Sequence, residues 1–205
     1  MSLLTTWGYT LTEADGLPAM LTVQEYATYT GRNDPPDRIE AEIDSACVAI
    51  RNFVGWHLAP SESCQVSINA LDRRIMYVGR DILIQLPARF VTEVTSVAID
   101  GTEYTDVSVD TNGLIRVFDA YAASRRSNIV VNYTAGLEGA ALNPIKELIA
   151  NRVTHAIAVP AGITSEASGG VSVTYNAGWI NNSRATALVG DNKELLVPYK
   201  VQGVF

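Results

Sequence analysis

Residues 36 to 55 carry an apolar stripe that only a long amphipathic helix presents on one face. Ile39, Ile43, Cys47, Ile50 and Val54 recur at steps of three and four residues, which is the spacing of side chains that share a helix face. The stripe spans about five turns at 3.6 residues per turn. Prolines and acids precede it and a glycine ends it, as is typical of helix termini. The sequence therefore predicts a helix over residues 36–55.

The period changes over residues 64–134, where polar and apolar residues alternate in short runs rich in Val, Ile and Tyr. Asp100-Gly101 and Asn112-Gly113 separate some of these runs. Asp-Gly and Asn-Gly between alternating runs are strong hairpin signals. The pattern predicts a compact antiparallel β unit.

Two further helices flank this β region. Residues 22–30 open on Thr22 and Glu25, the spacing of a capping box. Residues 144–158 open after Asn143 with Pro144 at the first helical position, where proline is favoured. The predicted fold is α+β: a helical core, with long helices at 36–55 and 144–158, and an antiparallel β-hairpin insertion between them.

The remaining segments are less regular. Residues 1–20 show no clear period, and we interpret them as an arm that becomes ordered only against a partner. Residues 161–170 read as a Gly/Ser-rich loop, and residues 171–175 alternate like a strand. Ser183 can cap a last short helix running through Val189. The domains expected are thus the arm 1–20, a domain 21–182, and a C-terminal helix and tail 183–205.

Charge and composition exclude several classes of protein. The net charge is −7 and the pI is about 4.8, whereas a protein that grips nucleic acid phosphates needs a basic face. No apolar run reaches the length of a transmembrane helix, and residues 1–8 lack the pattern of a signal peptide. We expect a soluble protein that makes no stable contact with nucleic acid or membrane.

Residues suited to catalysis or metal binding are few and scattered. His57 and His155 are the only histidines. His155 lies beside the apolar stripe of its helix, and His57 follows the helix 36–55, where it can cap the last carbonyl groups. Cys47 and Cys64 do not have the spacing of zinc ligands. Glycine-rich phosphate loops and nucleophile elbows are absent from the sequence. We therefore predict no catalytic site, no metal and no cofactor.

The order of these elements is similar to that of the phage head–tail connector family, the adaptor proteins that bind beneath the portal of long-tailed phages. The resemblance covers roughly residues 21 to 157. It rests on the two N-terminal helices, on Leu86-Pro87 followed by a valine-rich strand ending at Asp100-Gly101, and on residues 129–136 followed by the helix of Pro144. Phe90 departs from the pattern, because the family usually has another proline there.

The resemblance implies a structural subunit of the virion at the head–tail junction, synthesised in the bacterial host cytoplasm. It implies a closed ring of about twelve copies that binds the portal protein, extends the DNA channel without sequence-specific DNA contacts, and offers its far face to a tail-completion (stopper) protein. Family adaptors often grip the portal with their C-terminal segment. The apolar tail has no obvious intramolecular partner, and its expected docking residues are Leu195, Leu196, Val197, Pro198, Tyr199, Val201, Val204 and Phe205. The alternative is that the tail packs on its own domain or is disordered.

Two other readings of the sequence stay open at this point. One is a non-enzymatic β-rich binding module of a phage tail or cell surface, with the hairpins as its recognition surface. The other is a small enzyme whose site is assembled from distant residues. Long helices on both sides of the β region favour the adaptor over the first, and the lack of catalytic motifs disfavours the second.

Overall fold

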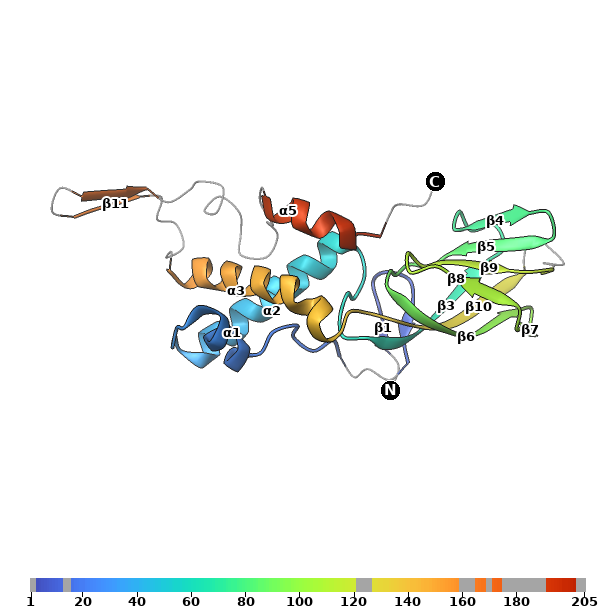
Figure 1. Ribbon diagram of the computed structural model, residues 1–205, viewed down its shortest axis with the longest axis horizontal. Coiled ribbons are helices and arrows are strands. Elements are labelled where there is room, and N and C mark those ends of the chain that lie inside the picture. The colour runs from blue at the N-terminus through green and yellow to red at the C-terminus, as the bar shows by residue number, and fades with distance from the viewer. Residues whose placement is uncertain are drawn as a thin grey trace. The chain divides into compact units, whose positions relative to one another are not determined.

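The computed structural model describes residues 3–12, 16–120, 127–158, 165–168, 171–174 and 191–201. The chain divides into two compact units, which we describe separately (Figure 1). The β unit comprises residues 1–18, 55–138 and 199–205, and the helical unit comprises residues 19–54 and 139–198. The predicted domain 21–182 therefore contributes to both units.

The helical unit is built on α2 (Pro36–Val54) and α3 (Asn143–Ala158), with the short α1 (Val23–Thr30) beside them (Figure 1). The predicted apolar stripe is the buried face of α2, and most of its side chains are almost fully shielded from water. Burial of each large aliphatic side chain contributes about 1.5–3 kcal/mol. The helices predicted at residues 22–30, 36–55 and 144–158 are confirmed, with ends that differ by at most one residue. A 3₁₀ turn, η1 (Gly139–Leu142), precedes α3 and was not predicted.

The capping box at the start of α1 is confirmed. The Glu25 amide donates to the Thr22 hydroxyl at 3.1 Å, and the Thr22 amide donates to the Glu25 carboxylate at 2.9 Å. Lys146 of α3 forms an ion pair with the same carboxylate. This ion pair, more than the bond from Thr22, holds the pKa of Glu25 below its ordinary value. One side chain thus caps α1 and links it to α3.

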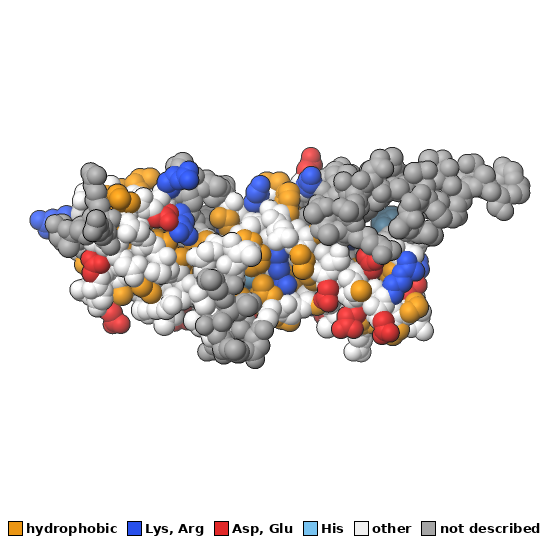
Figure 2. Space-filling view, turned by 180° about the vertical axis from the view of Figure 1, so that it is seen from behind, with side chains coloured by type: hydrophobic (Ala, Val, Ile, Leu, Met, Phe, Trp, Pro, Cys, Tyr) orange, Lys and Arg blue, Asp and Glu red, His pale blue; other side chains and the backbone are white. Residues whose placement is uncertain are grey.

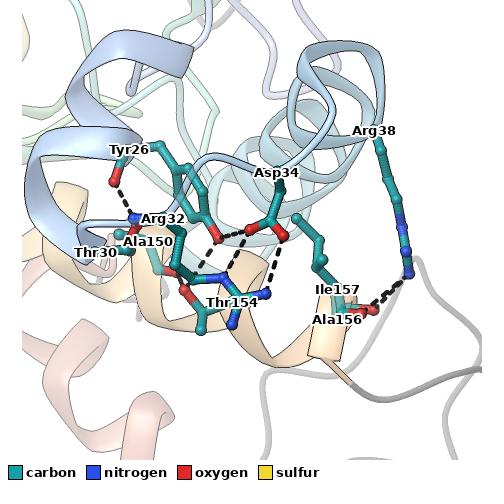
Figure 3. A network of polar contacts seen from close by, with 9 residues as sticks. All are labelled: Tyr26, Thr30, Arg32, Asp34, Arg38, Ala150, Thr154, Ala156 and Ile157. Atoms are coloured by element: carbon teal, nitrogen blue, oxygen red, sulfur yellow. Dashed lines mark hydrogen bonds and ion pairs between the residues drawn. The ribbon is translucent and has the colours of Figure 1, made fainter.

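A polar network joins the connection between α1 and α2 to α3 (Figure 3). The Arg32 guanidinium donates two hydrogen bonds to Asp34, at 2.7 and 3.0 Å, and lowers the pKa of that carboxyl group. The Tyr26 hydroxyl lies 3.3 Å from both Asp34 and Thr154. Arg38 reaches the carbonyl groups of residues 156 and 157 at the end of α3, where a cation complements the helix dipole.

The β unit contains two antiparallel sheets. The six-stranded sheet has the order β1-β2-β3-β10-β6-β7 and the four-stranded sheet the order β4-β5-β9-β8. The first consists of β1 (Leu3–Leu4), β2 (Thr10–Leu11), β3 (Glu62–Asn69), β10 (Asn128–Ala135), β6 (Val91–Ile99) and β7 (Thr102–Tyr104). The second consists of β4 (Ile75–Val78), β5 (Asp81–Gln85), β9 (Leu114–Val117) and β8 (Val107–Val109).

Alternation along the strands gives each sheet one buried face. In β10 every second residue from Ile129 to Ala135 is buried, and Val131 pairs with Val66 on one side and Val97 on the other. In the four-stranded sheet Ile82 and Ile84 lie in register with Val117 and Ile115, and all four are fully buried. The prediction of an antiparallel α+β fold is therefore confirmed.

The N-terminal residues are not the arm that the sequence suggested. Residues 3–12 form a β-hairpin whose second strand, β2, pairs with β3 at the edge of the six-stranded sheet. Tyr9 and Leu11 are buried. Each of these strands is only two residues long, so it has no detectable period by itself, and only the neighbouring strand supplies its partners. The β unit is therefore more than an insertion between helices.

The strand β7 was not predicted. Two further points concern the segments after α3. Residues 165–168, which we read as loop, form β11 and pair with β12 (Val171–Thr174), whose strand character was predicted. Backbone pairing with β12 makes β11 a strand without a clear apolar alternation of its own. The short helix expected at residues 183–189 lies outside the described residues. The helix observed nearby is α5 (Asp191–Leu196).

Gly136 lies directly against the backbone of Pro60 and Ser61 in the β unit. Its φ is +143°, and a Cβ atom there would lie 2.4 Å from the carbonyl oxygen of Pro60 and 2.5 Å from the Cα atom of Ser61. Both neighbours are backbone atoms, so no side-chain rotation relieves the clash. Only glycine fits here.

We predict that Gly136→Ala lowers the free energy of unfolding by more than the roughly 1–3 kcal/mol of ordinary overpacking. Gly101→Ala is the control, because Gly101 also has a positive φ but faces open space, and it should cost only about 1–2 kcal/mol. Urea denaturation of both variants measures the difference. Equal losses would contradict the assigned contact with Pro60.

Candidate partner-contact surface

The first part of the expected docking segment belongs to the helical unit. Within α5, which packs on α2, Leu196 is fully buried whereas Leu195 is 62% exposed. Val197, in the following 3₁₀ turn η2 (Val197–Tyr199), is 57% exposed, and Pro198 is also exposed. The segment is therefore held by one leucine, while three neighbouring apolar residues face solvent.

The second part belongs to the β unit, where an aromatic cluster of Trp56, Phe90 and Tyr199 forms. The indole Nε1 of Trp56 donates to the carbonyl oxygen of Tyr199 at 2.7 Å. Phe90 stacks on Trp56 with ring centroids 6.1 Å apart and lies 5.8 Å from the ring of Tyr199. Arg89 donates to the carbonyl oxygen of Lys200 at 3.3 Å. These contacts fix the chain at residues 199–200.

The expectation that the tail has no intramolecular partner is thus wrong for Leu196 and Tyr199. Leu195, Val197 and Pro198 are exposed, Val201 is half-buried, and Val204 and Phe205 lie outside the described residues. The sequence did not indicate the aromatic cluster, because its three members are more than 30 residues apart and share no pattern. The departure at Phe90 was visible, but its partners were not.

His57 is a structural residue within the β unit and does not cap α2 with its side chain. Its ring is fully buried. Nε2 lies 2.8 Å from the carbonyl oxygen of Ala135, which only accepts hydrogen bonds, so Nε2 carries the proton. Nδ1 then accepts from the Tyr9 hydroxyl at 2.6 Å, and this hydroxyl accepts from the His57 amide at 3.0 Å. The histidine links the N-terminal hairpin to β10.

The other candidate residues also have ordinary surroundings. His155 lies on the exposed side of α3 in its last turn. Cys47 and Cys64 are buried and do not form a disulfide. No three His, Cys, Asp or Glu side chains are grouped as metal ligands in the part of the chain that the structure describes. None of the described helices is long and apolar enough to cross a membrane.

The Tyr133 hydroxyl is the one buried side-chain group without a hydrogen-bond partner among the described side chains. Burial raises the pKa of this hydroxyl well above its ordinary value. Tyr133 lies in register with Cys64 on β3. Burial likewise raises the pKa of the Cys64 thiol, to about 12, and it raises the pKa of the Cys47 thiol.

We predict that His57→Phe destabilises the protein by about 2–5 kcal/mol, because it leaves two buried hydrogen-bonding groups without their partner at about 1–3 kcal/mol each. Thermal and urea unfolding measure the loss. The matched control is His155→Phe, which changes an exposed residue and should stay within about 0.5 kcal/mol. Similar losses in both variants would rule out the role assigned to His57.

We predict that neither native thiol reacts appreciably with a thiolate-selective reagent at pH 8. The thiolate is the reactive form, and the raised pKa keeps both groups protonated at that pH. Both should react quickly once the chain is unfolded in denaturant. Rapid labelling of the folded protein would show that the cysteines are more accessible than their burial indicates.

Comparison with protein-family models matches residues 19–182 to the family described as HCP, head completion protein. A search of curated proteins finds no match. The matched range contains α1, α2, α3 and the strands from β3 onward, so it covers most of the chain and the region from which the connector resemblance was drawn. The chain therefore belongs to the head completion protein family, whose members are structural, non-enzymatic phage proteins of the virion at the head–tail junction.

Proposed function

We propose that the protein is an adaptor subunit that binds the portal protein and forms a ring of about twelve copies. The ring extends the DNA channel, and its far face receives the tail-completion (stopper) protein. Membership in a head–tail junction family supports this assignment. The same membership disfavours the alternative of a β-rich binding module of a phage tail or cell surface.

The exposed residues Leu195, Val197 and Pro198 carry the portal-binding part of the proposal. Large apolar side chains that stand side by side in solvent are typical of protein contact sites. Leu195 lies in α5 and Val197 begins the turn η2, next to the buried Leu196, so their backbone is already ordered before binding. Preorganisation of this kind lowers the entropic cost of association.

The charge of the protein suits a subunit past which DNA moves without binding. Figure 2 shows acidic side chains grouped on the helical unit, and α2 exposes Asp37, Glu40 and Asp44. Stable DNA binding requires cationic side chains that neutralise phosphates, whereas an acidic surface repels them. Sequence-specific contacts with DNA are not part of the proposed role.

We predict that Leu195→Glu with Val197→Glu weakens portal binding by roughly a hundredfold or more. Burial of the two side chains contributes about 1.5–3 kcal/mol each, and each 1.4 kcal/mol is tenfold in affinity. Co-sedimentation with purified portal rings measures binding, and circular dichroism checks the fold. Deletion of residues 195–205 is a poorer test, because it also removes Leu196 and Tyr199 from their packing sites.

The matched control is Tyr29→Glu, which places an acid at an exposed aromatic residue of α1 in the same unit and should bind normally. If the wild-type protein does not bind portal rings, the adaptor role is wrong. If wild type and the double variant bind equally well, the adaptor role stands and the docking residues lie elsewhere.

A further inference from the structure

The strand β4 forms an edge of the four-stranded sheet that is unusually apolar for a surface. Met76, Tyr77 and Val78 are 48%, 52% and 45% exposed, and Leu71 just before the strand is 65% exposed. Among the described strands β4 pairs only with β5 (Figure 1). Exposed, apolar edge strands readily pair with another chain unless charges or coverage prevent it.

The backbone of β4 is also available at this edge. The Gln85 amide donates to the carbonyl oxygen of Arg74 at 2.8 Å, so these two residues form a hydrogen-bonded pair of the ladder. Hydrogen-bonded and non-bonded pairs alternate along an antiparallel ladder. Tyr77 therefore directs its amide and carbonyl groups away from β5, toward the open edge.

Positive charge flanks this edge on both sides. Arg73 is exposed, and the Arg80 side chain is 90% exposed, with Asp119 as its partner at 3.9 Å. A distant, solvated ion pair of this kind contributes little. Arg74 and Arg116, by contrast, are paired with Asp72 and Asp81. The net positive charge at the β4 edge comes from the two flanking arginines.

The other edge strand of the same sheet, β8, has an acidic residue on each side. From residue 91 to residue 115 the chain has five acidic residues and neither Lys nor Arg. Asp106 and Asp110 flank the edge strand β8 and are exposed. Glu103, also exposed, lies on β7, which precedes β8 in the chain and belongs to the six-stranded sheet. Val109 on β8 is 40% exposed. This edge thus offers apolar surface with negative charge around it.

We propose that the β4 edge of one copy docks against the acidic β7–β8 side of a second copy. This inference rests on the proposed ring and names the surfaces that form it. The two surfaces differ in sign and lie at opposite ends of the strand order β4-β5-β9-β8. A contact between two different surfaces repeats head to tail, as a closed ring requires.

Strand direction and charge both favour the β7–β8 side of a second copy as the partner of the β4 edge. Each neighbouring pair in the sheet is antiparallel, so β4 and β8 run in opposite directions. When β4 of a second copy lies beside β8 of the first, the antiparallel order of the sheet continues across the contact. Pairing of β4 with β4 would instead bring the arginines of two copies together, and like charges across an interface are unfavourable.

Charge reversal tests the proposal by sedimentation velocity, over a range of protein concentrations and in the presence of portal rings. The first variant combines Arg73→Glu with Arg80→Glu, and the second combines Glu103→Lys with Asp106→Lys. Asp110 is left unchanged because its carboxylate accepts a hydrogen bond from the Asn112 amide. The control, Glu40→Lys with Asp44→Lys on α2, reverses two exposed acids of the helical unit.

We expect each reversed variant to need roughly tenfold or more protein to assemble, because like charges then face each other. The control should assemble as wild type does. An equimolar mixture of the two reversed variants should recover assembly, since acidic and basic surfaces meet at every contact when the copies alternate. Loss of folding cannot produce this recovery.

A second experiment uses Met76→Cys and Ser108→Cys in separate chains. Both residues are exposed. Met76 pairs with Leu83, Leu83 with Arg116, and Arg116 with Ser108, so Met76 and Ser108 lie in one row across the sheet. Under mild oxidation the mixture should give a disulfide-linked dimer that neither variant gives alone, and the native cysteines are buried. Dimers of Met76→Cys alone would show β4–β4 pairing and overturn the proposal.

The outcomes separate this inference from the proposed function. If wild-type protein forms rings and both reversed variants assemble equally well, the assigned surfaces are wrong and the adaptor role stands. If wild-type protein does not self-associate at any concentration or on portal rings, both the ring and its surfaces are wrong.

Discussion

The β unit depends on the burial of alternate side chains of β10, the strand that lies between β3 and β6. Residues 62–69, 91–99 and 128–135 are far apart in the sequence, and these ladders bring them together. The next residue, Gly136, passes against the backbone at Pro60, and Ala135 accepts a hydrogen bond from His57. The centre of the sheet therefore also positions the segment that follows α2 and, through Tyr9, the N-terminal hairpin.

The C-terminal segment, for which we propose contact with the portal, is held by other parts of the chain. One buried leucine and one hydrogen bond from Trp56 hold the chain on either side of Val197. Val197, which lies between these contacts, is exposed. The exposed apolar side chains of β4 differ from those of the C-terminal segment, because they lie on an edge strand whose backbone is also open. We propose different partners for the two surfaces, the portal for the first and a second copy for the second.

Membership in a head completion family is the reason for proposing partners at the head–tail junction for these surfaces. The absence of catalytic motifs agrees with that membership, and the buried His57 is accounted for by hydrogen bonds that hold the fold together. The protein's acidity is spread unevenly, since the stretch from residue 91 to 115 lacks any basic residue while arginines flank β4. A uniformly acidic subunit would repel its copies, whereas this distribution allows oppositely charged surfaces to meet.

The sequence by itself determined α1, α2, α3 and most of the strands, because these depend on local periodicity, capping residues and turn dipeptides. It also determined the order of elements from which the family was recognised. Only the tertiary structure decided that residues 3–12 complete a sheet, that Trp56, Phe90 and Tyr199 meet, and that Leu196 is buried while Leu195 is exposed. Strands of two residues carry no period, and contacts between distant residues are selected by packing, so neither leaves a local signal.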